Sequence, residues 1–404
     1  MDNIKQKIQI IDPVNIKREV NLIGADLVTI PIFEAKSQII PIKIYDVIPA
    51  AANILKQEML SLGGDAIVHK YTINCKIDKT DVLLLGTLKH YKQLKIKLSY
   101  MPYWGLKEIG EELVKILESF QQKPSPIQIP HGQLTFDKPL IMGIINVTPD
   151  SFFNKSRKTK LDEIVKTAQK MIEEGADILD IGGESTRPGS DPVPLEEELN
   201  RVIPAIKIIR KEVSDKIPIS IDTYKSVVAD KALEAGADII NDISGLRFDS
   251  EMSHVASHWN VPVVIMHIKG TPKDMQKNPN YNNFIKELHK YFVERISYAI
   301  SHGINESNII LDPGIGFGKR LQDNIDIFNH LRSMLMYNKP ILIGASRKSM
   351  IGMILNEKDP EKRLEGTLAL TAVAVEKGAH IIRVHDVKEN RKIVDLVHFL
   401  KTHK

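Results

Sequence analysis

The stretch Leu140-Ile-Met-Gly-Ile-Ile-Asn-Val-Thr-Pro-Asp-Ser-Phe152 decides how this chain folds. It begins with an apolar run that ends at Ile145 and is interrupted only by Gly143, which is the composition of a parallel strand buried on both faces. Polar residues then follow abruptly around Pro149, a residue that cannot continue a central strand. The pattern predicts a buried strand with a polar turn at its carboxyl end, where α/β folds place their functional sites.

Three later segments resemble one another and form an internal echo. They are Glu174-Gly-Ala-Asp-Ile-Leu-Asp-Ile-Gly182, Ala235-Gly-Ala-Asp-Ile-Ile-Asn-Asp-Ile243 and Lys377-Gly-Ala-His-Ile-Ile-Arg-Val-His385. Each is typical of a helix that ends on a glycine, a tight turn, and a buried strand with polar residues at its far end. A repeated unit of this kind indicates a parallel α/β fold.

Eight strands are predicted after residue 139, with helical segments between them. Their expected ranges are 140–146, 178–182, 218–222, 238–243, 261–267, 308–312, 340–345 and 380–385. This number of strands suits a (β/α)₈ TIM barrel. An open doubly wound sheet is the alternative, but no G-x-G-x-x-G dinucleotide loop follows the first strand.

The part before residue 121 is predicted to be a smaller α/β or α+β domain of unknown role (1–120). A proline-rich linker (121–130) would join it to the barrel domain (131–404). Strands are expected at 8–11, 39–44 and 82–85, and helices at 49–62 and 105–120. The apolar stripe of the last helix is expected to dock on the second domain.

Composition limits the classes of protein that remain. The 404 residues are 43% hydrophobic and 26% charged, as in a globular protein with sizeable cores. A net charge of +4 is too small to suggest a nucleic-acid or membrane partner. The single cysteine, Cys75, excludes an intrachain disulfide, and no run has the length of a signal core or membrane span. We therefore expect a soluble cytoplasmic protein.

Polar residues at the strand ends of a barrel converge on one side, and here they fall into two chemical groups. Asp222, Asn241 and Asp312 offer hydrogen-bond acceptors, which suit a flat heterocycle whose edge carries several N–H donors. The second group suits a phosphate or diphosphate bridged by Mg²⁺, and it consists of Asn146, Arg187, Arg383 and His385. Lys348 could serve either group. The alternative is that these residues form only salt bridges and caps at the barrel mouth.

Two further motifs need an interpretation. Gly314-Ile-Gly-Phe-Gly-Lys319 is similar to a phosphate-binding loop, but Pro313 replaces the first glycine and Arg320 the hydroxyl residue. We expect a flexible loop after the sixth strand. His267 has no partner at a metal-ligand spacing, so the sequence does not predict a zinc site.

Six ordered stretches resemble the signature sequences of the dihydropteroate synthase family. They are 144–152, 180–189, 241–243, 312–319, 346–349 and 383–386, and the resemblance covers 132–404. It implies a TIM barrel of a homodimeric, Mg²⁺-dependent transferase in folate biosynthesis. The reaction would condense (7,8-dihydropterin-6-yl)methyl diphosphate with 4-aminobenzoate to give 7,8-dihydropteroate and diphosphate.

The same resemblance implies roles for individual residues. The pterin would be held by Asp222, Asn241, Asp312 and Lys348, with Ile243, Met266 and Phe317 near its ring plane. Asn146 would bind the metal, and the diphosphate would contact Asn146, Thr186, Arg187, Arg383 and His385. The aminobenzoate would be framed by Phe152, Thr186, Pro188 and Ser346, and Asp150 would lie on the first loop.

Three other functions stay open at this point. The first is the same chemistry with a ribosyl-aminobenzene phosphate acceptor, as in a methanopterin-type pathway. The second is a pterin-dependent corrinoid methyltransferase, which would not need Arg383 and His385 aimed at a diphosphate. The third is a non-catalytic pterin-binding protein. The segment Phe153-Asn-Lys-Ser-Arg157 also departs from the small residues of many relatives, which leaves open how the first loop closes.

Overall fold

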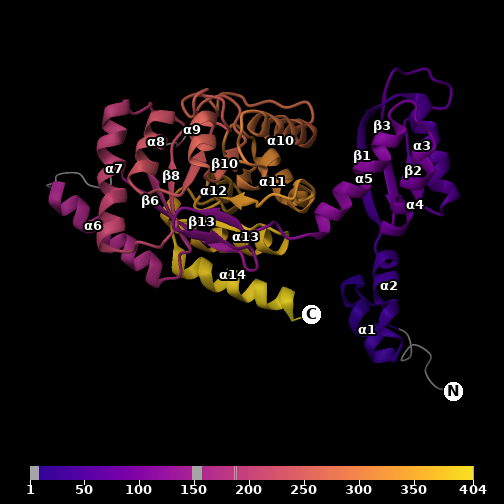
Figure 1. Ribbon diagram of the computed structural model, residues 1–404, viewed down its shortest axis with the longest axis horizontal. Helices are drawn as coiled ribbons and strands as arrows, with labels where there is room; N and C mark the ends of the chain where they lie inside the picture. Colours follow the sequence, from indigo (N-terminus) through magenta and orange to yellow (C-terminus); the bar gives the residue numbers. More distant parts are fainter. Residues whose placement is uncertain (1–8, 148–156, 186, 188, 404) are drawn as a thin grey trace. The chain divides into compact units, whose positions relative to one another are not determined.

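The computed structural model describes residues 9–147, 157–185, 187 and 189–403 (Figure 1). The chain forms two compact units that divide between Gln122 and Lys123. Each unit has its own apolar core, which explains why a proline-rich stretch separates them in the sequence. None of the helices in the described part of the chain is long and apolar enough to cross a membrane.

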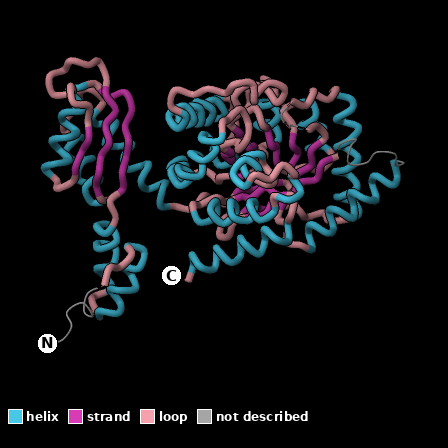
Figure 2. The backbone as a smooth tube through the Cα atoms, turned by 180° about the vertical axis from the view of Figure 1, so that it is seen from behind, coloured by secondary structure: helices cyan, strands magenta, loops and turns pink. Residues whose placement is uncertain are grey.

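The first unit is a three-stranded antiparallel sheet with helices (Figure 2). Strand β3 (Thr80–Gly86) lies between β1 (Ile40–Val47) and β2 (Asp65–Ile67). The helices are α1 (Ile16–Ile23), α2 (Ile30–Ser37), α3 (Pro49–Ser61), α4 (Leu88–Ser99) and α5 (Leu106–Gln121). Short 3₁₀ turns, Pro13–Asn15 and Leu27–Thr29, precede α1 and α2.

Two expectations for this unit were wrong. Residues 9–11 form no strand, because Asp12 caps the 3₁₀ turn that begins at Pro13 and so turns the chain. The apolar stripe of α5 lies in the core of its own unit, where Leu113 and Leu117 are buried. Gly110 permits this packing, since a Cβ there would lie 3.2 Å from both Leu98 and the backbone of Lys95 on α4.

The second unit is the expected barrel of eight parallel strands. They are β6 (Leu140–Asn146), β7 (Ile178–Gly182), β8 (Ile219–Asp222), β9 (Ile239–Asp242), β10 (Val263–Met266), β11 (Ile309–Asp312), β12 (Leu342–Ile343) and β13 (Ile381–Val384). They are paired in the order β11-β10-β9-β8-β7-β6-β13-β12. A parallel bridge between Leu311 and Ile341 joins the two ends of this order and closes the barrel.

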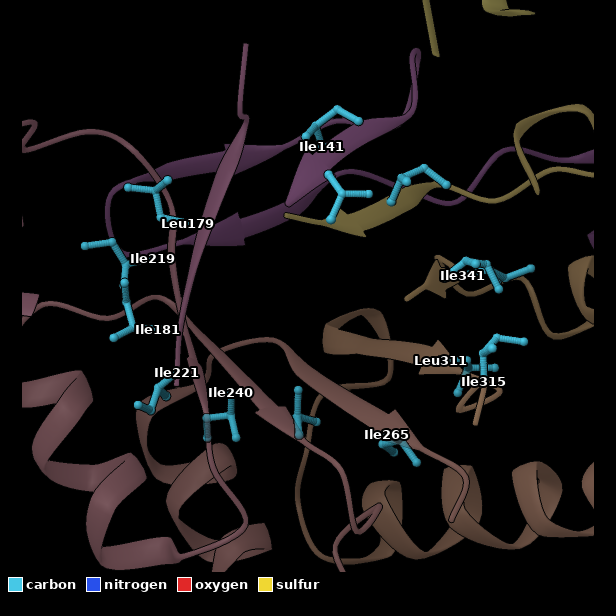
Figure 3. Packing of buried hydrophobic residues seen from close by; sticks show 14 of the residues in the cluster. Ile141, Leu179, Ile181, Ile219, Ile221, Ile240, Ile265, Leu311, Ile315 and Ile341 are labelled. Carbon is cyan, nitrogen blue, oxygen red and sulfur yellow. The ribbon is translucent and has the colours of Figure 1, made fainter. Parts of the chain in front are cut away.

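Helices surround the barrel in the β/α alternation that the sequence predicts (Figure 1). They are α6 (Arg157–Glu173), α7 (Leu195–Glu212), α8 (Ser226–Glu234), α9 (Met252–Trp259), α10 (Phe284–Ser301), α11 (Leu321–His330), α12 (Ser349–Leu355), α13 (Leu364–Glu376) and α14 (Val387–Thr402), with 3₁₀ turns at Glu306–Asn308, Leu331–Tyr337 and Pro360–Lys362. Strand side chains such as Ile221, Ile240 and Ile265 belong to the core between strands and helices (Figure 3).

A second apolar cluster fills the barrel interior near the amino ends of the strands. It contains Met142, Ile178, Ile239, Val264, Ile310, Leu342 and Ile381. The hairpin of β4 (Ile127–Ile129) and β5 (Gly132–Leu134) adds Ile127, Ile129, Leu134 and Phe136 to it. Part of the expected linker 121–130 is therefore a strand, because its isoleucines are needed to close this end of the barrel.

The amino ends of three strands are capped by equivalent residues of the echo. Asp177 accepts the backbone N–H of Ile141 at 2.7 Å, and Asp238 accepts that of Ile219 at 2.8 Å. His380 Nδ1 lies 3.1 Å from the N–H of Ile341 in the same way. The repeated sequence thus satisfies a backbone donor at three points around the barrel.

Candidate active site

The polar side chains of the barrel interior follow directly from the two-residue period of its strands. Ile178, Ile239, Ile310 and Ile381 belong to the inner apolar cluster, and the residues two positions further on are Asp180, Asn241, Asp312 and Arg383. Residues i and i+2 of a strand point to the same face, so these four face the barrel interior nearer the carboxyl ends. Together with Asp222 of β8 they form what we call the polar layer.

Arg383 binds two carboxylates of the polar layer. Its Nε donates to Asp180 Oδ2 at 2.6 Å, and its Nη2 donates to Asp222 Oδ2 at 2.6 Å. Asn241 Nδ2 lies 3.3 and 3.4 Å from the two oxygens of Asp180. Residues predicted to hold the pterin and residues predicted to hold the diphosphate are therefore directly connected.

Burial dominates the electrostatics of this layer. It raises the pKa of Asp222 to about 7, and the nearby charge of Asp180 adds to this while Arg383 and Lys348 oppose it. Burial also raises the pKa of Asp312 to about 6, although a hydrogen bond from the Gly314 N–H lowers the pKa of this carboxyl. Perturbed titration of clustered groups in a barrel mouth is typical of an active site.

One acceptor of the layer has no partner among the described residues. The Oδ1 atom of Asp222 is buried and makes no hydrogen bond there, whereas Oδ2 is bonded to Arg383. A buried carboxylate oxygen without a donor costs free energy. A ligand N–H group placed at this oxygen would remove that cost.

An apolar wall lies beside the polar layer. The predicted ring-packing residues Ile243, Met266 and Phe317 belong to one buried cluster, which also contains Ile268 and Met275. The Lys348 Nζ atom stands 4.1 Å from the centroid of the Phe317 ring, and burial lowers the pKa of this lysine to about 8. The wall offers a flat heterocycle both an apolar face and a nearby cation.

His385 and Ser346 lie beside the layer, at the end of β13 and just after β12. Ser346 Oγ is 3.0 Å from His385 Nδ1, although the two were predicted to contact different substrates. Burial, followed by the charge of Arg383, lowers the pKa of His385 to about 4. The imidazole is therefore neutral near pH 7.

The remaining predicted residues divide into described and undescribed ones. Asn146 is half-buried at the end of β6, and its Oδ1 atom lies 3.8 Å from the position that a Cβ on Gly182 would take. Arg187 is exposed. Asp150, Phe152, Thr186 and Pro188 lie outside the described residues.

The loop after β11 is not the flexible segment that we expected. Lys319 is only 3% exposed, and its Nζ donates to the carbonyl oxygens of His267, Gly314 and Phe317 at 3.0, 2.8 and 3.0 Å. Gly314 approaches the chain so closely that a Cβ would lie 2.1 Å from the carbonyl oxygen of His267. The lysine that suggested a phosphate loop instead locks the segment that carries Phe317.

Two residues of the site were not predicted to have a role. Asp180 is fully buried and holds Arg383. Glu184, just after β7, accepts hydrogen bonds from the Tyr224 hydroxyl at 2.8 Å and from Lys225 Nζ at 2.6 Å. Lys225 also binds Glu198 of α7, so this cluster fixes the start of the segment that leads to Arg187.

A metal held by protein side chains alone is not evident in the described part of the chain. Across residues 9–147, 157–185, 187 and 189–403, no three histidine, cysteine, aspartate or glutamate side chains gather in a metal-binding arrangement. Mg²⁺ usually takes one or two protein oxygens together with water and substrate phosphates. The amide oxygen of Asn146 fits that requirement, because the missing side chain at Gly182 leaves space beside it.

Comparisons with known proteins agree with this geometry. A family profile described as "Pterin binding enzyme" matches residues 142–385. The dihydropteroate synthase of Synechocystis sp. is 44% identical over 271 residues, which cover 66% of this chain and 93% of that protein. The structure of Xanthomonas albilineans dihydropteroate synthase with 4-aminobenzoic acid is 40% identical, has a TM-score of 0.62, and covers 67% of this chain and 95% of its own.

A longer relative extends the similarity beyond the barrel. The probable bifunctional folylpolyglutamate synthase/dihydropteroate synthase of Haloferax volcanii is 36% identical over 355 residues, covering 85% of this chain and 41% of that protein. Because the second unit is shorter than this alignment, the similarity reaches into the first unit.

Replacing Lys319 by methionine should destabilise the second unit by at least about 2 kcal/mol, because buried carbonyl oxygens would lose their donor. The measurement is denaturant unfolding followed by circular dichroism. Lys339→Met is the matched control: that lysine is 7% exposed but has a single carboxylate partner, Glu306, whose side chain is largely in solvent. It should cost no more than about 1 kcal/mol. Equal losses in the two variants would contradict the locking role.

Proposed function

This chain belongs to the family of pterin-binding enzymes, and on that premise we propose that its barrel is a dihydropteroate synthase. Such an enzyme joins (7,8-dihydropterin-6-yl)methyl diphosphate to 4-aminobenzoate and releases diphosphate and 7,8-dihydropteroate. The observation that carries the proposal is the polar layer, in which Asp222 keeps one buried oxygen without a partner among the described residues. That oxygen and the carboxylate of Asp312 suit the donor-rich edge of a pterin.

The pterin ring would lie with that edge on Asp222, Asn241 and Asp312. Its face would pack on the apolar wall of Ile243, Met266 and Phe317, with Lys348 at its side. Acceptors in a water-poor barrel discriminate strongly against rings that lack the matching N–H groups, because a wrong ring would leave them unpaired.

The diphosphate would lie beside Arg383, His385 and Arg187, with Thr186 from outside the described residues. If the neutral His385 accepts the Ser346 hydroxyl at Nδ1, its proton would stand on Nε2, from where it would donate to a phosphate oxygen. Arg383 supplies the positive charge that a departing diphosphate needs.

Mg²⁺ would be held by Asn146 together with diphosphate oxygens and water. When bound, the ion would offset negative charge on the leaving group. The side chain of Asn146 contributes one neutral oxygen, and no other described residue is assigned to the metal. This assignment stays a prediction.

The reaction breaks one C–O bond and forms one C–N bond. The electrons of the C–O bond leave with the diphosphate, and the pterin ring stabilises the positive charge that develops on its methylene carbon. The neutral amine of 4-aminobenzoate attacks that carbon and afterwards loses a proton, so no strong general base is required. Ser346, with Phe152 and Pro188 from outside the described residues, would frame this second substrate.

The decisive assay is diphosphate release by the full-length chain from the pterin diphosphate, with each candidate acceptor in turn. We expect turnover with 4-aminobenzoate and formation of 7,8-dihydropteroate. Turnover with a ribosyl-aminobenzene phosphate alone would instead support the methanopterin-type alternative. Release with neither acceptor would contradict the proposed function, and so would methyl transfer to a corrinoid.

The raised pKa values of Asp222 and Asp312, about 7 and about 6, predict how pterin binding depends on pH. Both carboxyls take up protons as the pH falls through these values, and a protonated carboxyl is a poorer acceptor for pterin N–H groups. The affinity for the bare pterin alcohol should therefore decrease on acidification, by up to about tenfold per pH unit for each proton taken up. Calorimetric titrations between about pH 5 and pH 9 measure it. Asp222→Asn should reduce the dependence of this affinity on pH. An affinity that rises on acidification would contradict the assignment.

A homodimer is also part of the proposal. Helix α14 carries a stripe of exposed apolar residues, Leu396, Phe399 and Leu400, which are 57%, 56% and 60% exposed in the single chain. A face of this kind favours an interface. Light scattering should find a dimer for the chain and a monomer for Leu400→Glu, with Ile300→Glu on α10 as the control. A monomeric unsubstituted chain would exclude the homodimer.

The cytoplasmic location and the lack of nucleic-acid or membrane partners stay predictions.

A further inference from the structure

We infer that Asp180 is a positioning residue that couples the pterin end of the site to the diphosphate end. The inference rests on the proposed function. Asp180 touches one residue from each predicted group, Asn241 and Arg383. Its side chain is fully buried in the middle of β7, and both of its oxygens are engaged by these two residues. It acts through its neighbours rather than on a substrate.

The barrel brings these three residues together by its strand order. Strand β7 is separated from β9 by β8 and from β13 by β6. Side chains from alternate strands form one layer inside a barrel of this kind, so Asp180 has Asn241 on one side and Arg383 on the other. No other residue of the polar layer contacts both of them through the hydrogen bonds of the described residues.

Asp180 sets the position of Arg383 when substrate enters. Arg383 is shared between Asp180 and Asp222 at the same distance of 2.6 Å. A pterin that engages Asp222 competes with Arg383 for that carboxylate. Because Asp180 Oδ2 lies 2.6 Å from both Nε and Nη2 of the guanidinium, Arg383 would stay beside the pterin, and its third nitrogen, Nη1, would be the one directed to the diphosphate. Without that second carboxylate, Arg383 would be drawn to Asp222 and would oppose pterin binding.

Asp180 also orients the amide of Asn241. The Nδ2 group of Asn241 faces the Asp180 carboxylate, which accepts and cannot donate. The amide oxygen is therefore turned away from Asp180 and remains as an acceptor for a ligand. An uncharged amide at position 180 would remove this preference, since it can face either end of the Asn241 amide.

The test is Asp180→Asn in the full-length chain, which keeps the shape of the side chain and removes its charge. Calorimetry should show that the affinities for the bare pterin alcohol and for the pterin diphosphate both fall by about tenfold or more. Asp180 raises the pKa of Asp222, so the pH midpoint of alcohol binding should also move to lower pH. If Asp180 only stabilised the fold, the folded Asp180→Asn variant would keep both affinities.

Asp238→Asn is the matched control. Asp238 is also fully buried and also pairs with an arginine, Arg210, at 2.5 Å, but it caps the amino end of β8 by accepting the N–H of Ile219. The Asp238→Asn variant should be less stable, but its affinities for the pterin alcohol and the pterin diphosphate and its pH midpoint should be unchanged. If Asp180→Asn does not fold, Asp180→Glu keeps the charge and displaces the carboxylate, so it should lower both affinities without moving the midpoint.

The outcomes separate this inference from the function on which it rests. Diphosphate release by the unsubstituted chain tests the function alone. If that chain turns over and Asp180→Asn binds both ligands as tightly as Asp238→Asn does, the coupling role is overturned and the function stands. A loss confined to one of the two ligands would also overturn it. If the unsubstituted chain neither turns over nor binds the pterin alcohol, the function and the inference both fall.

Discussion

A guanidinium held between two buried carboxylates is the interaction on which the rest of the site depends. Charges placed inside a barrel are costly unless they are paired, and breaking such a pair leaves an uncompensated buried charge. Arg383 contacts both Asp180 and Asp222, and these contacts keep the three side chains in place. The same pairing leaves Asp222 with a free acceptor that faces no donor in the described residues. One buried acceptor of the site is thus left for a ligand donor.

The barrel strands determine where this interaction can lie. On β7, β9, β11 and β13 the interior side is apolar first and polar two positions later, while outward residues such as Ile221, Ile240 and Ile265 pack in the core between strands and helices (Figure 3). A hairpin closes the amino end, so substrates can approach the polar layer only from the carboxyl ends. Lys319 and Glu184 then fix the loops that leave these ends. The polar residues of the site therefore lie toward the carboxyl ends of the strands, and the apolar residues that stabilise the barrel lie toward the amino ends, as in other TIM barrels.

Much of this arrangement could be predicted from the sequence. Aliphatic runs bounded by glycine and polar turns placed all eight strands, because a parallel strand buried on both faces leaves a strong local signal. Asp180 was nevertheless not predicted to have a role, because it lies in the middle of β7, whereas the predicted members of the polar layer stand at or next to the last position of their strands. Yet the echo aligns Asp180, Asn241 and Arg383 at the same offset from Gly175, Gly236 and Gly378, so the sequence did contain the connection. The locking role of Lys319 could not be predicted, because one of its three carbonyl partners, that of His267, lies 52 residues away in the sequence.

A crystal structure of the full-length chain with a non-reactive analogue of the pterin diphosphate tests the central claim most directly. The account predicts pterin N–H groups within hydrogen-bond distance of Asp222 Oδ1 and of the Asp312 carboxylate. It also predicts that Arg383 stays on Asp180 while it contacts a phosphate oxygen. A pterin ring bound outside the polar layer, or an Arg383 that has left Asp180, would contradict the account.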